Sequence, residues 1–553
     1  MIHDPRSLSV RCSLLFFIFC IIYGFIIIKL YYIQIYNNLF FTQLGKQQYG
    51  FNVTQLSPRA SIMDRHGKDL AINRQSISAF IFPHKLRDRA TVESFLAQHF
   101  PHASAQLQDH TKQFIYVQRA LSPEQLDIIN KACIKDIYLL QESSRFYPVP
   151  CTGLVVGKTD VDNNGILGIE YKYNNTLMGT PSIASLHKDA RSGHYYFKKE
   201  TKQVGNSGTP LYLTIDSNLQ FLVTEELQKA VARVGANYGC ALIMDPQTGE
   251  ILTMTTWPHA NPNISSIRSL EDTKNRVISD AFELGSVIKV FCALAALEQS
   301  TVTPEELIDC RNTKTACIDG RTINTPKAHG AIPFTDVIAH SNNIGIAIVA
   351  KRIGDQLYNH YTRFGFGTKT GINLPGEHKG FVNHPSRWSK QSIISLSYGY
   401  EITTTLLQIS CAFCMIARNG YPVRPTITRP FSPIITATHS SDTDVCPCCS
   451  PESIMAIKRI LERTTQAGTA QHARIKGYTI MSKTGTANQL TNGIYDHNKH
   501  LYTCAGIIEK NGYQRVIVTF LNNSHYPNAY ASTIVAPLFE RITQKMLIHE
   551  RIL

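Results

Sequence analysis

The longest apolar stretch of the chain lies near its start. Residues 12–28 contain no charged side chain, and after Lys29 the apolar pattern continues to Ile33. The 22 residues from Cys12 to Ile33 would form a helix of about 33 Å, enough to cross a bilayer core of roughly 30 Å if Lys29 extends toward the interface. The pattern therefore predicts a membrane-spanning helix.

A cleaved signal peptide is the alternative, because Arg6 and Arg11 form a short basic region before the apolar stretch. Cleavage requires small residues after that stretch, but the chain continues Lys-Leu-Tyr-Tyr-Ile-Gln-Ile-Tyr. We therefore expect residues 1–36 to form a short cytoplasmic tail and an uncleaved anchor. The two arginines favour a cytoplasmic N-terminus, and no second stretch of this length follows, so the rest of the chain is expected outside the cytoplasm.

The region after the anchor has short mixed segments without a sustained repeat. Residues 60–71 predict a strand that turns at His66-Gly67 and returns as a second strand. Gly-Asn-Ser-Gly at 205–208 is the predicted boundary, because glycine and small polar residues favour a linker. A separate domain is therefore predicted over residues 37–207.

The pattern is more regular over residues 208–553. Residues 210–216 predict a strand, and Ser217–Val234 predicts a helix with one apolar face. Two apolar runs around Asp-Pro-Gln-Thr-Gly at 245–249 predict a hairpin. A helix over 451–465, strands over 478–487, 501–509 and 513–521, and a helix from about Ser532 complete the predicted elements. Their segregated order favours an α+β fold, with an antiparallel sheet and helices on its faces.

Composition limits the classes of protein that fit this chain. At 553 residues and 43% hydrophobic content it is a globular protein with two to four folded units, neither collagen-like nor disordered. The net charge of +14 would suit an anionic membrane, an anionic polymer or nucleic acid. Because the charge is spread along the chain without a dense basic run, we predict a solvated basic surface and no nucleic-acid partner.

Twelve of the 14 cysteines lie beyond the predicted anchor, where disulfides can persist. Cys310 and Cys317 flank a short polar loop and are the simplest candidate pair. Cys446, Cys448 and Cys449 lack the paired spacing and the partner histidines of a zinc site. We interpret these three as surface thiols or as an intermolecular bridge.

Ser286 and Lys289 share the pattern S-x-x-K. Gly285 ends the preceding turn and residues 287–297 are apolar and helix-favouring, so Ser286 is expected to open a buried helix. Residues three apart on a helix are neighbours, so the Lys289 amine could reach the Ser286 hydroxyl and act as its base if burial and a second cation lower its pKa. The pattern is weak alone, because residues 185–188 also match it.

A second candidate pair is Ser341 and Asn343, in the pattern S-x-N. A serine hydroxyl can relay a proton, and an asparagine amide can hold a substrate carbonyl. Neither role can be assigned from this short pattern alone.

The tripeptide Lys-Thr-Gly occurs twice. In the copy at Lys483, alternation along the predicted strand places Thr484 and Thr486 on one face, Gly485 lets a ligand approach the backbone, and the lysine supplies a cation. Such a strand edge can bind an extended peptide and its terminal carboxylate. The copy at 369–371 leads into a loop with proline and glycine, so Lys483 is the predicted site residue.

The three motifs, in this order, resemble those of the penicillin-binding proteins and serine β-lactamases. Residues 59–71, 145–148 and 168–170 resemble landmarks of the pedestal domain of class B, membrane-anchored penicillin-binding proteins. Residues 397–408 resemble a segment of the transpeptidase domain, closer to the division branch than to the elongation branch. The resemblance implies a transmembrane helix, an elongated pedestal over 37–207 and a serine β-lactamase-like transpeptidase domain over 208–553.

The resemblance implies D,D-transpeptidation of peptidoglycan in cell division, with inhibition by β-lactams. Ser286 would attack the penultimate D-Ala carbonyl of a stem peptide with Lys289 as base, and the Ser286 and Thr486 N–H groups would form the oxyanion hole. Ser341 would pass a proton to the departing D-Ala, and Asn343 would orient the peptide. The terminal carboxylate would be held by Lys483, Thr484 and Thr486.

The resemblance also implies partners and a location. It implies no metal and no organic cofactor. The partners would be peptidoglycan stem peptides, β-lactam antibiotics, a polytopic septal glycosyltransferase and other division proteins. The chain would be a single-pass protein of the inner membrane with its catalytic domain in the periplasm.

Other functions remain open from the sequence. An elongation-branch transpeptidase or a D,D-carboxypeptidase would use the same acyl-enzyme. The anchor and the pedestal argue against a small secreted β-lactamase. A non-catalytic division scaffold has no need for the complete motif set.

Overall fold

The computed structural model of the chain divides into two compact units, residues 1–58 with 178–208 and residues 59–177 with 209–553. It describes residues 5–55, 58–109, 111–188, 195–203, 205–264, 269–429, 446–491, 493–527 and 529–552. The domain boundaries predicted at residues 36 and 207 remain predictions.

The first unit contains the predicted membrane helix. Helix α1 (Pro5–Tyr31) continues as a π-helical turn to Tyr36, and its large apolar side chains from Val10 to Tyr31 are exposed. Residues 9–36 are long and apolar enough to cross a membrane. The remaining elements of this unit are α2 (Asn38–Tyr49) and a three-stranded sheet of β1 (Gly50–Gln55), β8 (Ser182–Lys188) and β9 (Tyr195–Gln203).

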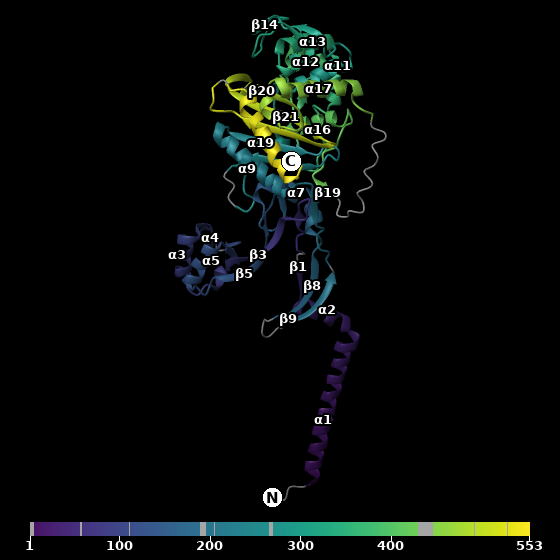
Figure 1. Cartoon of the computed structure of the whole chain (residues 1–553). Coiled ribbons are helices and arrows are strands. Elements are labelled where there is room, and N and C mark those ends of the chain that lie inside the picture. The colour runs from purple at the N-terminus through teal and green to yellow at the C-terminus, as the bar shows by residue number, and fades with distance from the viewer. Residues whose placement is uncertain are drawn as a thin grey trace. The chain divides into compact units, whose positions relative to one another are not determined.

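The second unit begins with the hairpin predicted at His66-Gly67. Strand β2 (Ile62–Met63) pairs with β3 (Asp69–Ile81), which extends far beyond the predicted end because it also pairs with β4 (Ile115–Gln118) and β5 (Tyr138–Phe146). Three helices gather at the far end of β3 and β5 and share a small apolar core with them (Figure 1). These are α3 (Arg89–His99), α4 (Pro101–Leu107) and α5 (Pro123–Ala132).

A buried charge cluster holds the base of β3 and β5. The Glu170 carboxylate on α7 (Gly168–Lys172) accepts from Arg59 Nε at 2.6 Å and from Arg145 Nε at 2.7 Å. All three side chains are at most 2% exposed. In such a site two guanidinium groups depend on one carboxylate for their charge balance.

Glu170→Gln should therefore lower the free energy of unfolding by about 3–5 kcal/mol, because it leaves buried arginine charge uncompensated. Denaturant unfolding of the full chain measures this loss. The matched control is Glu306→Gln, which removes a 35% exposed carboxylate from its 2.6 Å ion pair with Arg352 and should cost less than about 1 kcal/mol. Equal costs at the two positions would contradict this account of the cluster.

A five-stranded sheet is antiparallel throughout, in the order β12-β11-β22-β21-β20. Its strands are β11 (Tyr238–Met244), β12 (Ile251–Trp257), β20 (Thr479–Thr491), β21 (Ile494–Lys510) and β22 (Tyr513–Asn522). The hairpin and the three late strands predicted from the sequence are thus confirmed. Strand β20 lies at the end of this order, so one of its edges carries no strand among the described residues.

Helices cover both faces of this sheet, which confirms the α+β prediction. Helix α9 (Ser217–Val234), with the predicted bounds, and α19 (Ala536–His549) lie together over one face (Figure 1). Ala241 and Ile243 point to these helices, whereas Cys240 and Leu242 point to the opposite core. That core contains α11 (Lys289–Glu298), α16 (Leu406–Ala417) and α17 (Pro451–Ala467).

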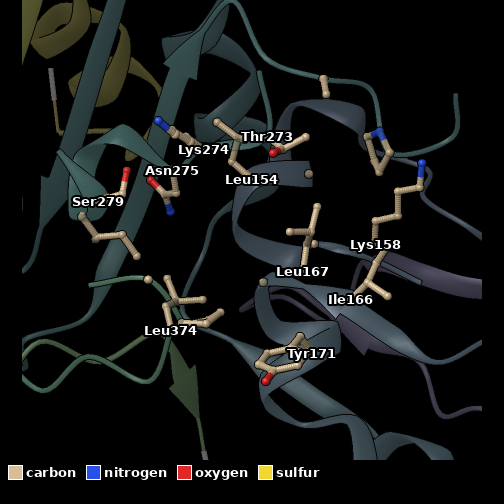
Figure 2. Close-up of a pocket in the computed structure, with 18 of the residues that line it drawn as sticks. Leu154, Lys158, Ile166, Leu167, Tyr171, Thr273, Lys274, Asn275, Ser279 and Leu374 are labelled. Atoms are coloured by element: carbon tan, nitrogen blue, oxygen red, sulfur yellow. The ribbon is translucent and has the colours of Figure 1, made fainter. Parts of the chain in front are cut away.

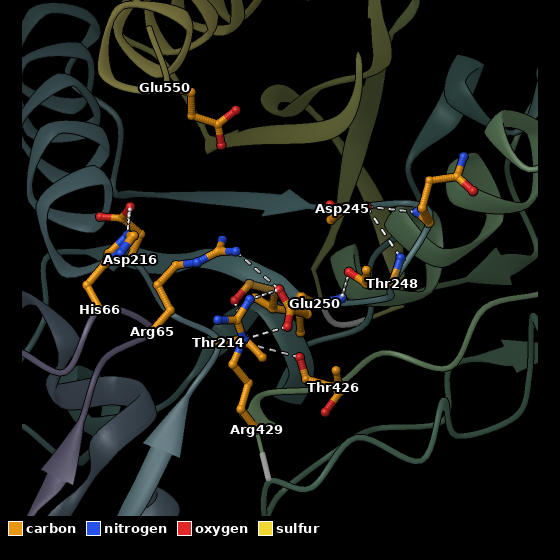
Figure 3. A network of polar contacts seen from close by, with 12 residues as sticks. Arg65, His66, Thr214, Asp216, Asp245, Thr248, Glu250, Thr426, Arg429 and Glu550 are labelled. Carbon is orange, nitrogen blue, oxygen red and sulfur yellow. Dashed lines mark hydrogen bonds and ion pairs between the residues drawn. The ribbon is translucent and has the colours of Figure 1, made fainter. Parts of the chain in front are cut away.

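A polar network joins the hairpin of β2 and β3 to this sheet. Asp216 Oδ1 accepts from Leu219 N at 3.0 Å and so caps α9, while its Oδ2 lies 3.1 Å from His66 Nε2. Next to it, Glu250 accepts from Arg65 at 3.3 Å and from Arg429 at 2.6 Å (Figure 3). These contacts fix the start of α9. They therefore also help to position the layer of helices on this face of the sheet.

The predicted disulfide pair is not formed. Cys310 is buried, Cys317 is exposed, and both are free thiols. Cys310 Sγ points into the core, where a Cβ on Gly345 would lie 2.9 Å from it. Its burial keeps it away from Cys317, so the sequence-based pairing is wrong in this structure.

Candidate active site

Ser286 lies on a short turn at the start of a buried helix. Residues Gly285–Val287 form a 3₁₀ turn, and α11 follows from Lys289. The α-helix thus begins three residues later than predicted, with Ser286 in the tighter turn before it. Ser286 is half-buried, whereas Lys289 is fully buried.

This turn packs directly against β20. Gly285 has φ +55°, and a Cβ there would lie 2.6 Å from the Thr486 carbonyl oxygen. A Cβ on Gly485 would lie 2.3 Å from the Leu284 carbonyl oxygen. Both positions therefore require glycine, and the requirement at Gly485 arises from the turn that carries Ser286. This contact brings the first and third motifs together.

The Lys289 amine reaches the second motif. Its Nζ donates to Ser341 O at 2.6 Å, to Ser341 Oγ at 3.0 Å and to Asn343 Oδ1 at 2.5 Å. Among the hydrogen bonds of the described residues, none joins Lys289 Nζ to Ser286 Oγ. The structure therefore brings S-x-x-K and S-x-N together through the lysine.

Ser341 lies between two lysines. Its Oγ accepts from Lys289 Nζ and, at 3.1 Å, from Lys483 Nζ on β20. Ser341 follows α12 (Phe334–Ala339) with φ +57°, an uncommon conformation for a residue with a Cβ. Such strain is kept only where the surrounding contacts enforce it, and here the two amines and the start of α13 (Asn343–Ile353) do so.

Burial changes the charge of both lysines. Burial lowers the pKa of Lys483 to about 7. Burial, and secondarily the charge of Lys483, hold the pKa of Lys289 well below its usual value. Two ammonium groups sharing one hydroxyl cannot both stay charged in a dry site. The lowered pKa favours the neutral form of Lys289, which is the form that can accept a proton.

Asn343, Thr484 and Thr486 make further hydrogen bonds to residues outside the three motifs. Asn343 Nδ2 donates to the Asn324 carbonyl at 2.5 Å, which fixes its amide. Thr484 Oγ1 donates to Thr469 Oγ1 at 3.0 Å, and Thr486 Oγ1 accepts from Ala531 N at 3.0 Å. The hydroxyl hydrogen of Thr486 thus stays available to a ligand at this edge of the sheet.

The second Lys-Thr-Gly copy lies elsewhere. Lys369 is exposed in a loop, and Thr370 Oγ1 donates to Glu377 Oε1 at 2.5 Å within that loop. The contacts of this copy are local, whereas Lys483 contacts Ser341. The predicted loop at 369–371 is confirmed.

Lys483→Ala should lower the rate of acylation by a carboxylate-bearing penicillin roughly 10- to 100-fold, because a charge-assisted contact to the carboxylate is lost. Lys369→Ala, its matched control, should leave the rate unchanged. Stopped-flow acylation of the full chain measures both. If Lys369→Ala abolished acylation and Lys483→Ala did not, the assignment of the two copies would be reversed.

A separate cavity of about 310 Å³ lies away from these motifs. Its lining includes Leu154, Lys158 and Tyr171 from one segment and Asn275 and Leu374 from others (Figure 2). None of the eight motif residues predicted from the sequence lines it. This cavity is therefore separate from the candidate active site.

The sequence reasoning missed several charged residues beside the Ser286 turn. Glu283 Oε1 accepts from Glu401 N at 2.8 Å, and Glu401 lies 3.7 Å from Arg321. These residues come from three distant segments, so no local pattern joins them. The only signal was that Glu401 lies within residues 397–408, which the family resemblance covers.

Comparison with known proteins decides the family. The family model described as "Penicillin binding protein transpeptidase domain" matches residues 239–544, and "Penicillin-binding Protein dimerisation domain" matches residues 54–213. The chain belongs to the class B penicillin-binding proteins. All three motifs lie within residues 239–544, the range that the transpeptidase family model matches.

Named relatives of this penicillin-binding protein cover most of its length. "Peptidoglycan D,D-transpeptidase FtsI" of Buchnera aphidicola subsp. Baizongia pistaciae is 31% identical over 89% of this chain and 87% of its own. The protein of the same name from Escherichia coli (strain K12) is 30% identical over 88% and 82%. A crystal structure of Penicillin binding protein 3 from Mycobacterium tuberculosis with aztreonam matches with TM-score 0.69 and 25% identity, over 90% of this chain and 98% of that chain.

Proposed function

We propose that this penicillin-binding protein cross-links peptidoglycan stem peptides in cell division, by D,D-transpeptidation through an acyl-enzyme at Ser286. The observation that carries the proposal is the buried Lys289 amine, 3.0 Å from Ser341 Oγ and three residues from Ser286, with its pKa held low. With its lowered pKa, Lys289 can serve as the base for the half-buried Ser286 hydroxyl, three residues before it in the chain. The two FtsI relatives are named for the same reaction.

The first half of the reaction forms the acyl-enzyme. Ser286 Oγ attacks the penultimate D-Ala carbonyl carbon, and the hydroxyl proton passes to neutral Lys289. The Ser286 and Thr486 N–H groups receive the oxyanion, a contact worth about 3 kcal/mol per donor. The amide bond then breaks, and the departing D-Ala nitrogen takes its proton through Ser341, whose Oγ contacts both lysines.

The second half transfers the acyl group. A stem-peptide amine attacks the ester carbon, gives up one proton, and forms the new amide while Ser286 regains its hydroxyl hydrogen. Asn343 would orient the peptide, and Lys483, Thr484 and Thr486 would hold the terminal carboxylate during the first half. A β-lactam, whose ring amide takes the place of the D-Ala-D-Ala bond, would acylate Ser286 in the same way.

The location and partners complete the proposal. Helix α1 would anchor the chain in the inner membrane, with the N-terminus in the cytoplasm and the catalytic domain in the periplasm. A polytopic septal glycosyltransferase and other division proteins would be its partners. The apolar exposed helix and the family resemblance support this part.

Product analysis of the full-length chain tests the proposal. A donor pentapeptide ending in D-Ala-D-Ala is supplied with an acceptor amine, and cross-linked product is measured against free D-Ala. We expect cross-linked product in proportion to the acceptor. Release of D-Ala without cross-linking would favour a D,D-carboxypeptidase, and the absence of both would favour a non-catalytic scaffold.

A further inference from the structure

The cavity of about 310 Å³ lies where two segments of the second compact unit meet. One segment spans residues 153–171, and the other contributes residues within 260–279 and 374–376 (Figure 2). The first segment falls within the match to the dimerisation-domain model, and the second falls within the match to the transpeptidase model. An occupant of the cavity would therefore contact both family domains of the chain.

Each wall of the cavity is held by its own backbone contacts. In the first segment, a Cβ on Gly157 would lie 1.8 Å from the Leu167 carbonyl oxygen, so this close packing requires glycine. In the second segment, the Ile278 carbonyl accepts from His378 N at 2.8 Å. This bond ties the loop before His378 to α10 (Arg276–Ser279). Neither wall needs an occupant to hold its shape, so the cavity is preformed, as most small-molecule sites are.

The lining of the cavity is mostly apolar. Its aliphatic and proline side chains are Leu154, Ile166, Leu167, Pro262, Ile278, Leu374 and Pro375. At about 30 Å³ of liquid volume per water molecule, the space corresponds to about ten waters. Replacing waters that lie against aliphatic side chains by an apolar group is favourable. The cavity therefore fits the apolar part of a small organic molecule.

The charge of the lining defines the polar end of that molecule. None of the described residues that line the cavity is acidic, whereas Lys158 and Lys274 line it from opposite sides (Figure 2). Lys274 is neutralised by Glu271 at 2.6 Å. Lys158 Nζ donates to the Ile264 carbonyl at 3.1 Å and forms no ion pair with a described residue. Burial lowers the pKa of Lys158, as expected for an amine without a carboxylate beside it.

We propose that this cavity binds a small organic carboxylate with an apolar body. The body lies among Leu154, Ile278 and Leu374, and the carboxylate pairs with Lys158. An uncharged molecule leaves Lys158 unpaired, and a cation is repelled by it. Aromatic acids and fatty acids share this chemistry, so both are used as probes. The site is independent of the reaction at Ser286, because none of the eight motif residues lines the cavity.

Titration calorimetry of the full-length chain in lipid nanodiscs tests the site, with empty nanodiscs as the blank. Naphthoate should bind at one site per chain with a Kd on the order of 10–100 µM, as expected for a ligand of this size. Naphthamide has the same rings without the charge, and naphthylmethylammonium has the opposite charge. Both should bind at least about 10-fold more weakly, because they lack the charge-assisted contact. Octanoate carries the same charge on a flexible chain, and the tighter of the two acids distinguishes an aromatic acid from a fatty acid as the source.

Three lysine variants locate the bound acid. Lys158→Met should weaken binding of naphthoate and octanoate roughly 10- to 100-fold, as the loss of a charge-assisted contact predicts. The matched control is Lys172→Met, which removes an exposed lysine next to Tyr171 that does not line the cavity. It should keep the wild-type Kd. Lys483→Ala should also keep it, because Lys483 lies in the candidate active site, away from the cavity.

The proposal would be overturned if neither acid bound to the wild type, or if naphthamide bound as tightly as naphthoate. It would also be overturned if binding survived in Lys158→Met, or if Lys483→Ala abolished it, since the acid would then lie in the candidate active site. Ala260→Phe adds a ring to the lining and should abolish binding of both acids. If that variant does not unfold cooperatively, the comparison of Lys158→Met with Lys172→Met decides.

Discussion

Ser286→Ala is expected to leave the full-length chain without a covalent adduct after exposure to labelled penicillin. The substitution removes the oxygen that forms the ester, so acylation should fall by a factor on the order of 10⁴ or more. The turn should survive, because Gly285 and Gly485 hold it against β20 through backbone contacts. Gel fluorescence after incubation with the labelled drug measures the loss.

The chain offers a matched control for this change. Ser185 stands in the same S-x-x-K pattern with Lys188, on β8 of the other compact unit. Ser185→Ala should retain full labelling. If labelling persisted in Ser286→Ala and disappeared in Ser185→Ala, the nucleophile would be Ser185 and the assignment of Ser286 would be wrong.

Lys289→Met is expected to slow acylation by about 10²- to 10⁴-fold, the usual contribution of a general base. Methionine keeps the length and the burial of the side chain, so the packing of α11 should change little. In the wild type, acylation should weaken at acidic pH as Lys289 takes up a proton. In Lys289→Met the acylation rate should not show this fall at acidic pH. Second-order rate constants for penicillin acylation, measured against pH, test both points.

The same substitution has a consequence for stability. The pKa of Lys289 is lowered by folding, so below pH 10.5 the unfolded state binds more protons than the folded state. The free energy of unfolding therefore falls as pH decreases from that value, until the folded state also takes up the proton. Lys289→Met should weaken this slope by up to about 1.4 kcal/mol per pH unit. If the free energy of unfolding depended on pH in the same way in the wild type and in Lys289→Met, and the acylation rate were also unchanged, the role of Lys289 as a neutral buried base would be contradicted.

Local patterns predicted the five strands of the antiparallel sheet and several of the helices that cover it. The apolar face of residues 217–234 and the Asp216 cap define α9, and the turn at 245–249 defines the hairpin of β11 and β12. The predicted end of β3 near Ala71 was wrong, because the strand continues to Ile81 along β5. That pairing joins residues far apart in sequence, and no local periodicity reports it.

The candidate site shows the same division between local and distant information. The spacing of each motif, and their order, predicted the residues that the structure brings together at Ser341. The spacing suggested that Lys289 contacts Ser286, whereas its hydrogen bonds go to Ser341 and Asn343. The Glu283, Glu401 and Arg321 contacts were out of reach, because three separate segments must fold before they meet.

The position at which a penicillin attaches to the chain tests most directly whether Ser286 is the nucleophile. Peptide mapping by mass spectrometry of the penicillin-treated, full-length wild-type chain locates the adduct. The account predicts one adduct per chain, on the peptide that contains Ser286. An adduct on Ser341 or Ser185, or no adduct on the intact chain, would contradict it.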